Sequence, residues 1–286
     1  MKLRAVALAC ALCLSSCSRT SNIVVGSKNF TEQLILGEIA AQQLERKLRV
    51  PVQRKLDLGG TLLSHEALVK GEVDLYPEYT GTAASAILKQ KISADPITAY
   101  MQVKDAYRER FHLIWLPPLG FNDTFAMVVR RQDGERLRGP NLSAATARTW
   151  RLGVGYEFLT RPDGLRRLDQ VYSLHWHGTP RTMDLGLLYK ALQQDQIDMA
   201  AANSTDGLLT STAYLPLVDD RRAFPPYNAS LVVREALLHD RPMVGPALTM
   251  LSGRISDETM RDLNRRVDVL HRPIAEVARE FLAKEP

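Results

Sequence analysis

The sequence predicts an α/β protein made of two similar lobes. Short apolar strands alternate with helical segments over residues 23–126, and short links between them favour parallel pairing with right-handed crossovers. The segments 67–75 and 191–199 echo each other, so each lobe would offer a loop after an equivalent strand. The apolar strands 126–129 and 231–233 bracket the second region and are candidates for two interlobe crossings. Chance similarity of two strand-helix units remains an alternative explanation of the echo.

The composition is that of an ordinary globular chain: 286 residues, 45% hydrophobic and 24% charged. Its N-terminus has the layout of a secretory signal, because Lys2 and Arg4 precede an uncharged run over 5–16 that is too short to span a membrane. The run ends Leu-Ser-Ser-Cys17, which resembles a bacterial lipoprotein box. The resemblance implies cleavage before Cys17 and lipid attachment to its sulfur, with residues 17–22 as a tether. A plain signal peptide with an incidental cysteine is the alternative.

The first lobe is expected to begin with a strand over 23–26. The helix that follows has Leu34, Ile35, Ile39, Ala40 and Leu44 at helical spacing. Asn29 is a candidate N-cap, with Glu32 three residues later as in a capping box. Helix-start amides beside Lys28 would form an anion site. A capped helix with a solvated lysine is the alternative.

A strand over 52–58 and a helix over 61–70 lead to a strand over 73–76, which is expected to stop near Pro77. The turn after it presents a tyrosine ring, threonine hydroxyls and the flexible Gly81. Such a turn suits capture of a small, partly cationic solute, although a surface turn with a half-buried tyrosine has the same sequence. A helix over 96–111 and a strand over 112–118 follow.

The second lobe is expected to start with the strand 126–129 and a polar loop over 130–143. A strand over 152–155 precedes a helix over 157–168, and a helix over 183–194 precedes a strand over 197–201. From residue 236 the chain is amphipathic and helical, and it should pack onto the first lobe. Ser256 can cap one of these helices and Pro273 can open another.

No catalytic set, cofactor fingerprint or metal site stands out in the sequence. His175-Trp176-His177 lacks neighbouring cysteines or acids to complete a metal site, so we interpret it as a solvated loop. All three cysteines lie in the first 17 residues, which leaves the mature chain without disulfides. Lysine and arginine are scattered, and nothing indicates nucleic acid binding. No later stretch is apolar enough to span a bilayer.

Six ordered motifs resemble those of the osmoprotectant-binding proteins of ABC transporters, which bind glycine betaine, choline or carnitine. They begin at residues 26, 58, 79, 120, 204 and 224, and read GSKNFTEQ, LGGT, YTGT, GFNDTF, STDG and FPPY. The resemblance covers nearly all of the mature chain. It implies a type II periplasmic-binding-protein fold, with lobe 1 over 23–126 plus 230–286 and lobe 2 over 127–229.

The resemblance also implies a ligand site with two ends. The family surrounds a trimethylammonium group with four tyrosines; Tyr79 and Tyr227 match, whereas the other two positions hold Phe125 and Asn203. Asp123 matches an acidic residue near the ammonium. The carboxylate grip carries over to three positions, which are Lys28, Thr82 and Arg161.

The chemistry of these residues agrees with that division. A quaternary ammonium has no N–H, so ring faces must replace its water, and arginine can hold a carboxylate with two parallel bonds. Asn203 would instead suit an N–H or hydroxyl on a different betaine-like solute, for example ergothioneine.

The resemblance implies a monomeric, exported, lipid-anchored binding protein, periplasmic or on the outer face of the cell membrane, which serves an ABC permease and ATPase. A ligand sensor for a membrane receptor is an alternative that the sequence does not separate from transport. A periplasmic enzyme on the same scaffold is a third hypothesis, which the missing catalytic set disfavours.

Overall fold

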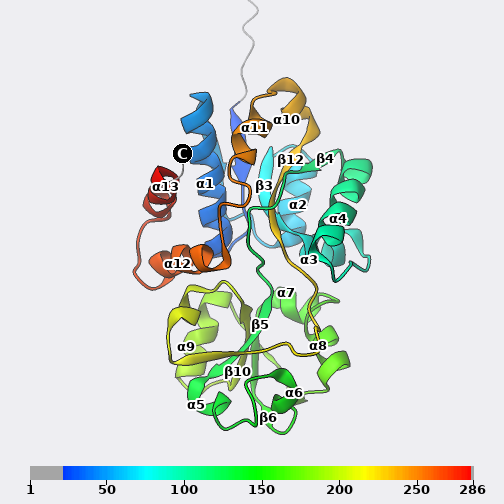
Figure 1. The fold of residues 1–286 in the computed structure, drawn as a ribbon, viewed down its shortest axis with the longest axis vertical. Coiled ribbons are helices and arrows are strands. Elements are labelled where there is room, and N and C mark those ends of the chain that lie inside the picture. Colours follow the sequence, from blue (N-terminus) through cyan, green and yellow to red (C-terminus); the bar gives the residue numbers. More distant parts are fainter. Residues whose placement is uncertain (1–21, 285–286) are drawn as a thin grey trace, which may run out of the picture.

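The computed structural model describes residues 22–284, which form two α/β lobes with a five-stranded mixed sheet in each (Figure 1). The first sheet has the strand order β2-β1-β3-β12-β4 and the second has the order β11-β5-β10-β7-β9. The predicted signal segment 1–16, Cys17 and residues 18–21 of the tether lie outside the described residues.

The elements of lobe 1 come from both ends of the described chain. Its strands are β1 (Ile23–Gly26), β2 (Val52–Lys55), β3 (Leu75–Tyr79), β4 (Leu113–Trp115) and β12 (Ala229–Arg234). Its helices are α1 (Thr31–Leu48), α2 (Thr61–Val69), α3 (Thr80–Thr82), the π-helical turn Ala83–Leu88, α4 (Pro96–Phe111), α10 (Glu235–Asp240), α11 (Val244–Thr249), α12 (Asp257–Asp268) and α13 (Ile274–Lys284).

Lobe 2 is built from one continuous stretch of chain. Its sheet contains β5 (Phe125–Arg130), β7 (Leu152–Val154), β9 (Arg181–Thr182), β10 (Met199–Asn203) and β11 (Tyr214–Leu217), and β6 (Thr149–Trp150) pairs with β8 (His175–Trp176) beside it. Its helices are α5 (Arg131–Gly134), α6 (Leu142–Ala145), α7 (Tyr156–Thr160), α8 (Leu165–Tyr172) and α9 (Leu188–Gln193), with 3-10 turns at Leu185–Leu187 and Gly207–Thr210.

The two sheets repeat one pattern of pairing, which explains the sequence echo. In lobe 1, β1 is parallel to β2 and β3, and β12 is antiparallel to β3 and β4; β7, β9, β10, β5 and β11 repeat this arrangement in lobe 2. The echoed aspartates also correspond. Asp74 accepts from Arg234 at the end of β12 (3.1 Å), and Asp198 accepts from Arg130 at the end of β5 (2.9 Å).

Two irregular segments carry the chain between the lobes, one from β4 to β5 and the other from β11 to β12 (Figure 1). The strands 126–129 and 231–233, which the sequence analysis proposed as the crossings, lie instead inside the two sheets, as parts of β5 and β12. The predicted lobe limits, 126/127 and 229/230, fall within these two strands and stay a prediction. The C-terminal helices, which follow β12 in the chain, pack on α1. Their residues Val277, Phe281 and Leu282 lie in the same apolar core as Ile35 and Ile39. The tail therefore belongs to lobe 1, as expected.

The expectation that the third strand stops near Pro77 is wrong. β3 runs from Leu75 to Tyr79, and Pro77 lies opposite Leu231 of β12. β1 pairs with β3 only at Leu75, so at Pro77 the edge of β3 that faces β1 no longer forms strand pairing. A residue without an N–H is tolerated at such an unpaired position.

Two further expectations for lobe 2 need correction. The stretch 130–143 contains the short helix α5 and the start of α6, rather than only loop. The helix expected over 157–168 is divided into α7 and α8, with Arg161 in extended conformation between them (φ −74°, ψ 144°). Pro162 explains the break, because the residue before a proline is driven out of the helical region.

Candidate functional site

The eight predicted site residues all lie where the two lobes meet. Each follows or precedes a strand or helix at that boundary, and their positions are Lys28 after β1, Tyr79 and Thr82 at the end of β3 and in α3, Asp123 and Phe125 at the entry to β5, Arg161 between α7 and α8, Asn203 at the end of β10, and Tyr227 before β12. All except Phe125 and Asn203, which are half-buried, are at most 9% exposed. The structure therefore brings together residues that are up to 199 positions apart.

On the lobe 1 side, the parallel register of β1 and β3 places Lys28 beside Glu78. Val25 pairs with Leu75, and three residues further on the Lys28 Nζ lies 2.6 Å from Glu78 Oε1. The same Nζ lies 5.2 Å from the ring centroid of Tyr79. Because Glu78 is fully buried, its carboxylate needs this partner, and it fixes the ammonium of Lys28 in place.

Arg161 and Tyr227 are joined through a buried carboxylate that the sequence analysis did not single out. Asp163 accepts from Arg161 Nε (3.0 Å), from Arg161 Nη2 (2.5 Å) and from the Tyr227 hydroxyl (2.5 Å). Burial opposes the charge of Asp163, but the guanidinium outweighs it and holds the pKa of this carboxyl below its usual range. Burial raises the pKa of Tyr227 well above its ordinary value, so the phenol stays neutral.

Phe125 belongs to a cluster of rings that is larger than predicted. Its ring meets Phe158, Phe224 and Tyr227 edge-on, at centroid distances of 4.8, 5.5 and 5.5 Å. The guanidinium of Arg161 lies 5.1 Å from the Phe125 centroid and 5.7 Å from that of Tyr227. Phe158 and Phe224 are absent from the predicted site, although Phe224 opens one of the six motifs and could have been found there.

Glu32 is a second site residue that the sequence reasoning misplaced. Phe30 occupies the N-cap position of α1 without a side-chain cap, and Asn29 is exposed, so the predicted capping box does not form. Glu32 instead accepts from the Tyr79 hydroxyl (2.7 Å) and from Thr205 Oγ1 (2.6 Å). Thr205 follows β10, so this carboxylate links a lobe 1 helix to the neighbouring strand end of lobe 2.

Asp123, in the segment that leads into β5, and Asn203, at the end of β10, complete the site. Asp123 Oδ1 lies 2.8 Å from Thr205 Oγ1, and burial together with the charge of Glu32 raises its pKa well above the ordinary value. Asn203 lies directly opposite Phe125 in the antiparallel ladder of β10 and β5, and its backbone N–H donates to Asp206 (3.1 Å). Cross-strand partners project to the same face of a sheet, so Asn203 and Phe125 share one face.

A further contact joins the lobes at the start of α2. Glu157 of α7 accepts from the backbone N–H of Thr61 (2.6 Å) and from its hydroxyl (3.0 Å). Although burial opposes it, Lys28 and these hydrogen bonds hold the pKa of Glu157 below its ordinary value. The carboxylate therefore sits at a helix N-terminus, where negative charge is favoured.

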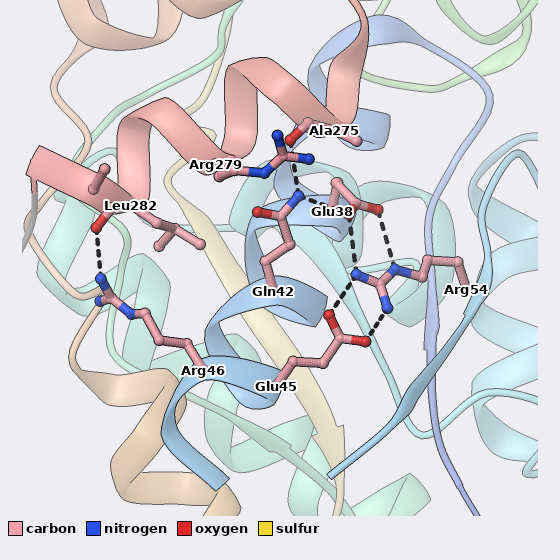
Figure 2. Close-up of a pocket in the computed structure, with 9 residues that line it drawn as sticks. Glu38, Gln42, Glu45, Arg46, Arg54, Ala275, Arg279 and Leu282 are labelled. Carbon is pink, nitrogen blue, oxygen red and sulfur yellow. Dashed lines mark hydrogen bonds and ion pairs between the residues drawn. The ribbon is translucent and has the colours of Figure 1, made fainter. Parts of the chain in front are cut away.

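A separate hollow of about 460 Å³ lies on lobe 1 between α1 and α13 (Figure 2). It is lined by Glu38, Gln42, Glu45, Arg46, Arg54, Ala275, Arg279, Leu282 and Ala283, none of which is a predicted site residue. Figure 2 shows the guanidinium of Arg54 held between Glu38 (3.0 Å) and Glu45 (2.8 Å), so its charge is already matched within the chain.

Two other kinds of feature are absent from residues 22–284. No group of three or more His, Cys, Asp or Glu side chains in this range is placed to hold a metal ion. No helix in the same range combines the length and apolarity needed to cross a membrane.

Comparison with known proteins identifies the family. Residues 21–284 match the family described as the substrate binding domain of the ABC-type glycine betaine transport system. The chain belongs to this family. Its members are substrate-binding proteins of transporters and not enzymes, which decides against the enzyme hypothesis.

Individual relatives agree with this assignment. The glycine-betaine-binding protein of Pseudomonas aeruginosa is 33% identical over 98% of this chain and 93% of its own length. The ergothioneine transport permease/ergothioneine binding protein of Helicobacter pylori is also 33% identical over 92% of this chain, which spans only 47% of that longer relative. A crystal structure of a glycine betaine/carnitine/choline ABC transporter protein has 28% identity and a TM-score of 0.78, and covers 92% of this chain and 98% of that one.

The chain is thus a substrate-binding protein of a betaine/carnitine-type ABC transporter, and the predicted two-lobe fold is confirmed. Proteins of this type are extracytoplasmic and work with a permease and an ATPase.

Proposed function

We propose that the chain captures one quaternary ammonium or zwitterionic solute, of the glycine betaine, choline or carnitine type, between its two lobes. The observation that supports this is the gathering of rings and basic groups from both lobes into one buried region. Tyr79, Phe125 and Tyr227 supply ring faces for the ammonium group, and Asp123 supplies a carboxyl near it. Each ring face contributes about 0.5–2 kcal/mol, depending on desolvation.

The other end of the solute, where it carries a carboxylate, would be held by Lys28, Thr82 and Arg161. Arg161 has five N–H donors, and its bonds to Asp163 and Glu157 occupy only part of them. Lys28 likewise has donors beyond the one that meets Glu78. Closure around the solute would bury both ends at once, so affinity would depend on lobe closure.

Titration calorimetry with glycine betaine, choline, carnitine and ergothioneine tests the ligand class. We expect at least one of them to bind, and Tyr79→Ala and Arg161→Ala to weaken that binding while both lobes stay folded by circular dichroism. If none of these solutes binds the wild-type protein, the proposed ligand class is wrong.

Ergothioneine is the second candidate solute. The Helicobacter pylori relative is named for it, and Asn203 replaces the fourth family ring with an amide that can accept from an N–H group. Ergothioneine carries ring N–H groups that glycine betaine lacks. Tighter binding of ergothioneine than of glycine betaine would favour this candidate, and the reverse order would exclude it as the preferred solute.

We further propose that the mature chain begins at Cys17 and is a monomer held at the membrane by a lipid on that residue. Expression of the full chain should place wild-type protein in the membrane fraction and Cys17→Ala protein in the soluble extracytoplasmic fraction. Equal distribution of the two would contradict the anchor. A sensor that docks on a membrane receptor is the alternative role, and neighbouring permease and ATPase genes would favour transport.

A further inference from the structure

Glu32 stands at the centre of a hydrogen-bonded bridge between the lobes. Its Oε1 accepts from the Tyr79 hydroxyl (2.7 Å), and its Oε2 accepts from Thr205 Oγ1 (2.6 Å) and from Asn264 Nδ2 (3.1 Å). Asn264, on α12, also donates to the backbone carbonyl of Thr205 (2.9 Å). We call Glu32, Tyr79, Thr205, Asn264 and Asp123 the interlobe bridge.

The geometry of Thr205 requires a proton on one of its neighbours. Its hydroxyl has a single hydrogen, yet its oxygen lies 2.6 Å from Glu32 Oε2 and 2.8 Å from Asp123 Oδ1. A hydroxyl can donate to only one of two carboxyl oxygens, so the other carboxyl must donate to it. Two ionised carboxylates around one hydroxyl, all at most 8% exposed, would leave a buried acceptor unmatched.

Of the two carboxyls, Asp123 is more favourably protonated than Glu32. Glu32 has two further donors, Tyr79 and Asn264, and both favour its ionised form. Burial raises the pKa of both carboxyls, and that of Asp123 is raised well above its ordinary value. The arrangement is therefore an ionised Glu32, a donating Thr205 hydroxyl and a protonated Asp123.

The titratable groups around the bridge agree with one bound proton. Asp206, after β10, interacts electrostatically with both Glu32 and Asp123, and Asp268 of α12 interacts with Asp206. Two cations flank the bridge: Lys28 lies over the Tyr79 ring and pairs with Glu78, and Arg261 of α12 donates from Nε to the backbone carbonyl of Ser204 (3.1 Å). The acids thus outnumber the cations here, which disfavours full ionisation.

We propose that Glu32 is a positioning residue for solute binding, which orients the Tyr79 ring and joins lobe 2 through Thr205 while Asp123 carries a proton in the closed arrangement. This inference rests on the proposed function, because it concerns the same site. When the lobes separate, Asp123 meets water and releases its proton near its ordinary pKa. Closure therefore takes up a proton, and solute affinity falls as the pH rises from about 5 to about 8. The positive charge of the solute favours ionised Asp123, so the fall is less than tenfold per pH unit.

The variants for the test remove the bridge step by step. Glu32→Ala removes its centre, Thr205→Val removes the hydroxyl at constant shape, and Thr205→Ser restores a hydroxyl. Glu38→Gln is the matched control, because Glu38 lies on the same helix, is similarly buried and pairs with Arg54 away from the site.

Calorimetry with the tightest-binding of the four solutes gives the first readout. We expect Glu32→Ala and Thr205→Val to weaken binding at least about tenfold, which corresponds to about 1.4 kcal/mol. Thr205→Ser and Glu38→Gln should stay within about twofold of wild type. Between pH 5 and 8, Glu32→Gln should lose the pH dependence, because the neutral amide can donate to the Thr205 hydroxyl, which then donates to an ionised Asp123 without a bound proton. Wild-type affinity in Glu32→Ala and Thr205→Val, or an unchanged pH profile in Glu32→Gln, overturns the proposal.

A direct readout of Asp123 separates this inference from the proposed function. Infrared spectra of the wild-type protein at pH 6, recorded without solute and with each of the four solutes, should contain in at least one condition the C=O stretch of a protonated carboxylic acid that is missing from Asp123→Asn. If that band is absent under every condition, the bridge is wrong whatever the protein binds. If the band is present but no solute binds, the proposed function fails and the bridge stands.

Discussion

Replacing Asn203 with tyrosine should raise the affinity for glycine betaine. Asn203 lies directly opposite Phe125 in the ladder between β10 and β5, so a side chain at 203 projects to the same face as the Phe125 ring. The Phe125 centroid is in turn 5.5 Å from that of Tyr227. A ring at position 203, which is half-buried, would therefore stand beside the two rings that we assign to the ammonium group.

The size of the effect follows from the value of one ring face. A ring over a quaternary ammonium contributes about 0.5–2 kcal/mol, which corresponds to about a two- to thirtyfold gain in affinity. Calorimetry would compare wild type, Asn203→Tyr and Asn203→Phe with glycine betaine. Both variants should gain if the ring face acts, whereas a gain by Asn203→Tyr alone would assign the effect to the hydroxyl.

The control is Asn203→Gln, which keeps an amide and should not gain affinity. Unchanged betaine affinity in Asn203→Tyr, with normal unfolding behaviour, would refute the reasoning, since position 203 would then not face the solute. A loss of ergothioneine binding in the same variant would independently support an acceptor role for the native amide.

Three further changes test the surrounding structure. Arg161→Met should destabilise the fold by about 3–5 kcal/mol, because it leaves the buried charge of Asp163 unpaired. Adding Asp163→Asn should recover much of that loss in urea unfolding. No recovery would mean that the unpaired charge is not the cause. Burial raises the pKa of Asp206 to about 7. As the pH rises from about 4 to 7, the wild-type protein should therefore lose unfolding free energy relative to Asp206→Asn, by at most about 4 kcal/mol. Parallel stability profiles of the two proteins over this pH range would contradict this. Gly81→Ala would place its Cβ 2.6 Å from the Tyr227 ring, so it should weaken solute binding in calorimetry, and wild-type affinity would show that this ring can move without cost.

Much of the fold was predictable, because it follows from periodicity and from the echo between 67–75 and 191–199. The echo reflects a shared structural role of Asp74 and Asp198. Each carboxylate accepts a hydrogen bond from an arginine at the end of a strand, Arg234 of β12 and Arg130 of β5 respectively. The prediction that the third strand ends near Pro77 failed because the outcome depends on strand pairing in the tertiary structure. Whether a proline fits inside a strand depends on which side is paired, and the sequence does not show where β1 stops.

The candidate site was predictable where a residue type matches a chemical task, as with Tyr79 or Arg161. The supporting residues were not. A glutamate three residues after an asparagine is the local pattern of a capping box, but the partners of Glu32 lie 47 and 173 positions away in the chain. Asp163 was missed for a different reason, since only the structure shows that it sits between a guanidinium and a phenol.

The position of β12 affects the order in which the chain can fold. This strand lies between β3 and β4, yet it is made after all of lobe 2, and α1 is covered by helices made later still. The N-terminal half therefore cannot finish its own sheet when it emerges, whereas 125–217 holds every strand of the second sheet in one stretch. Domains usually fold in the order of synthesis. Here lobe 2 should become native first, because lobe 1 cannot complete its sheet until about the last fifth of the polypeptide has been synthesised.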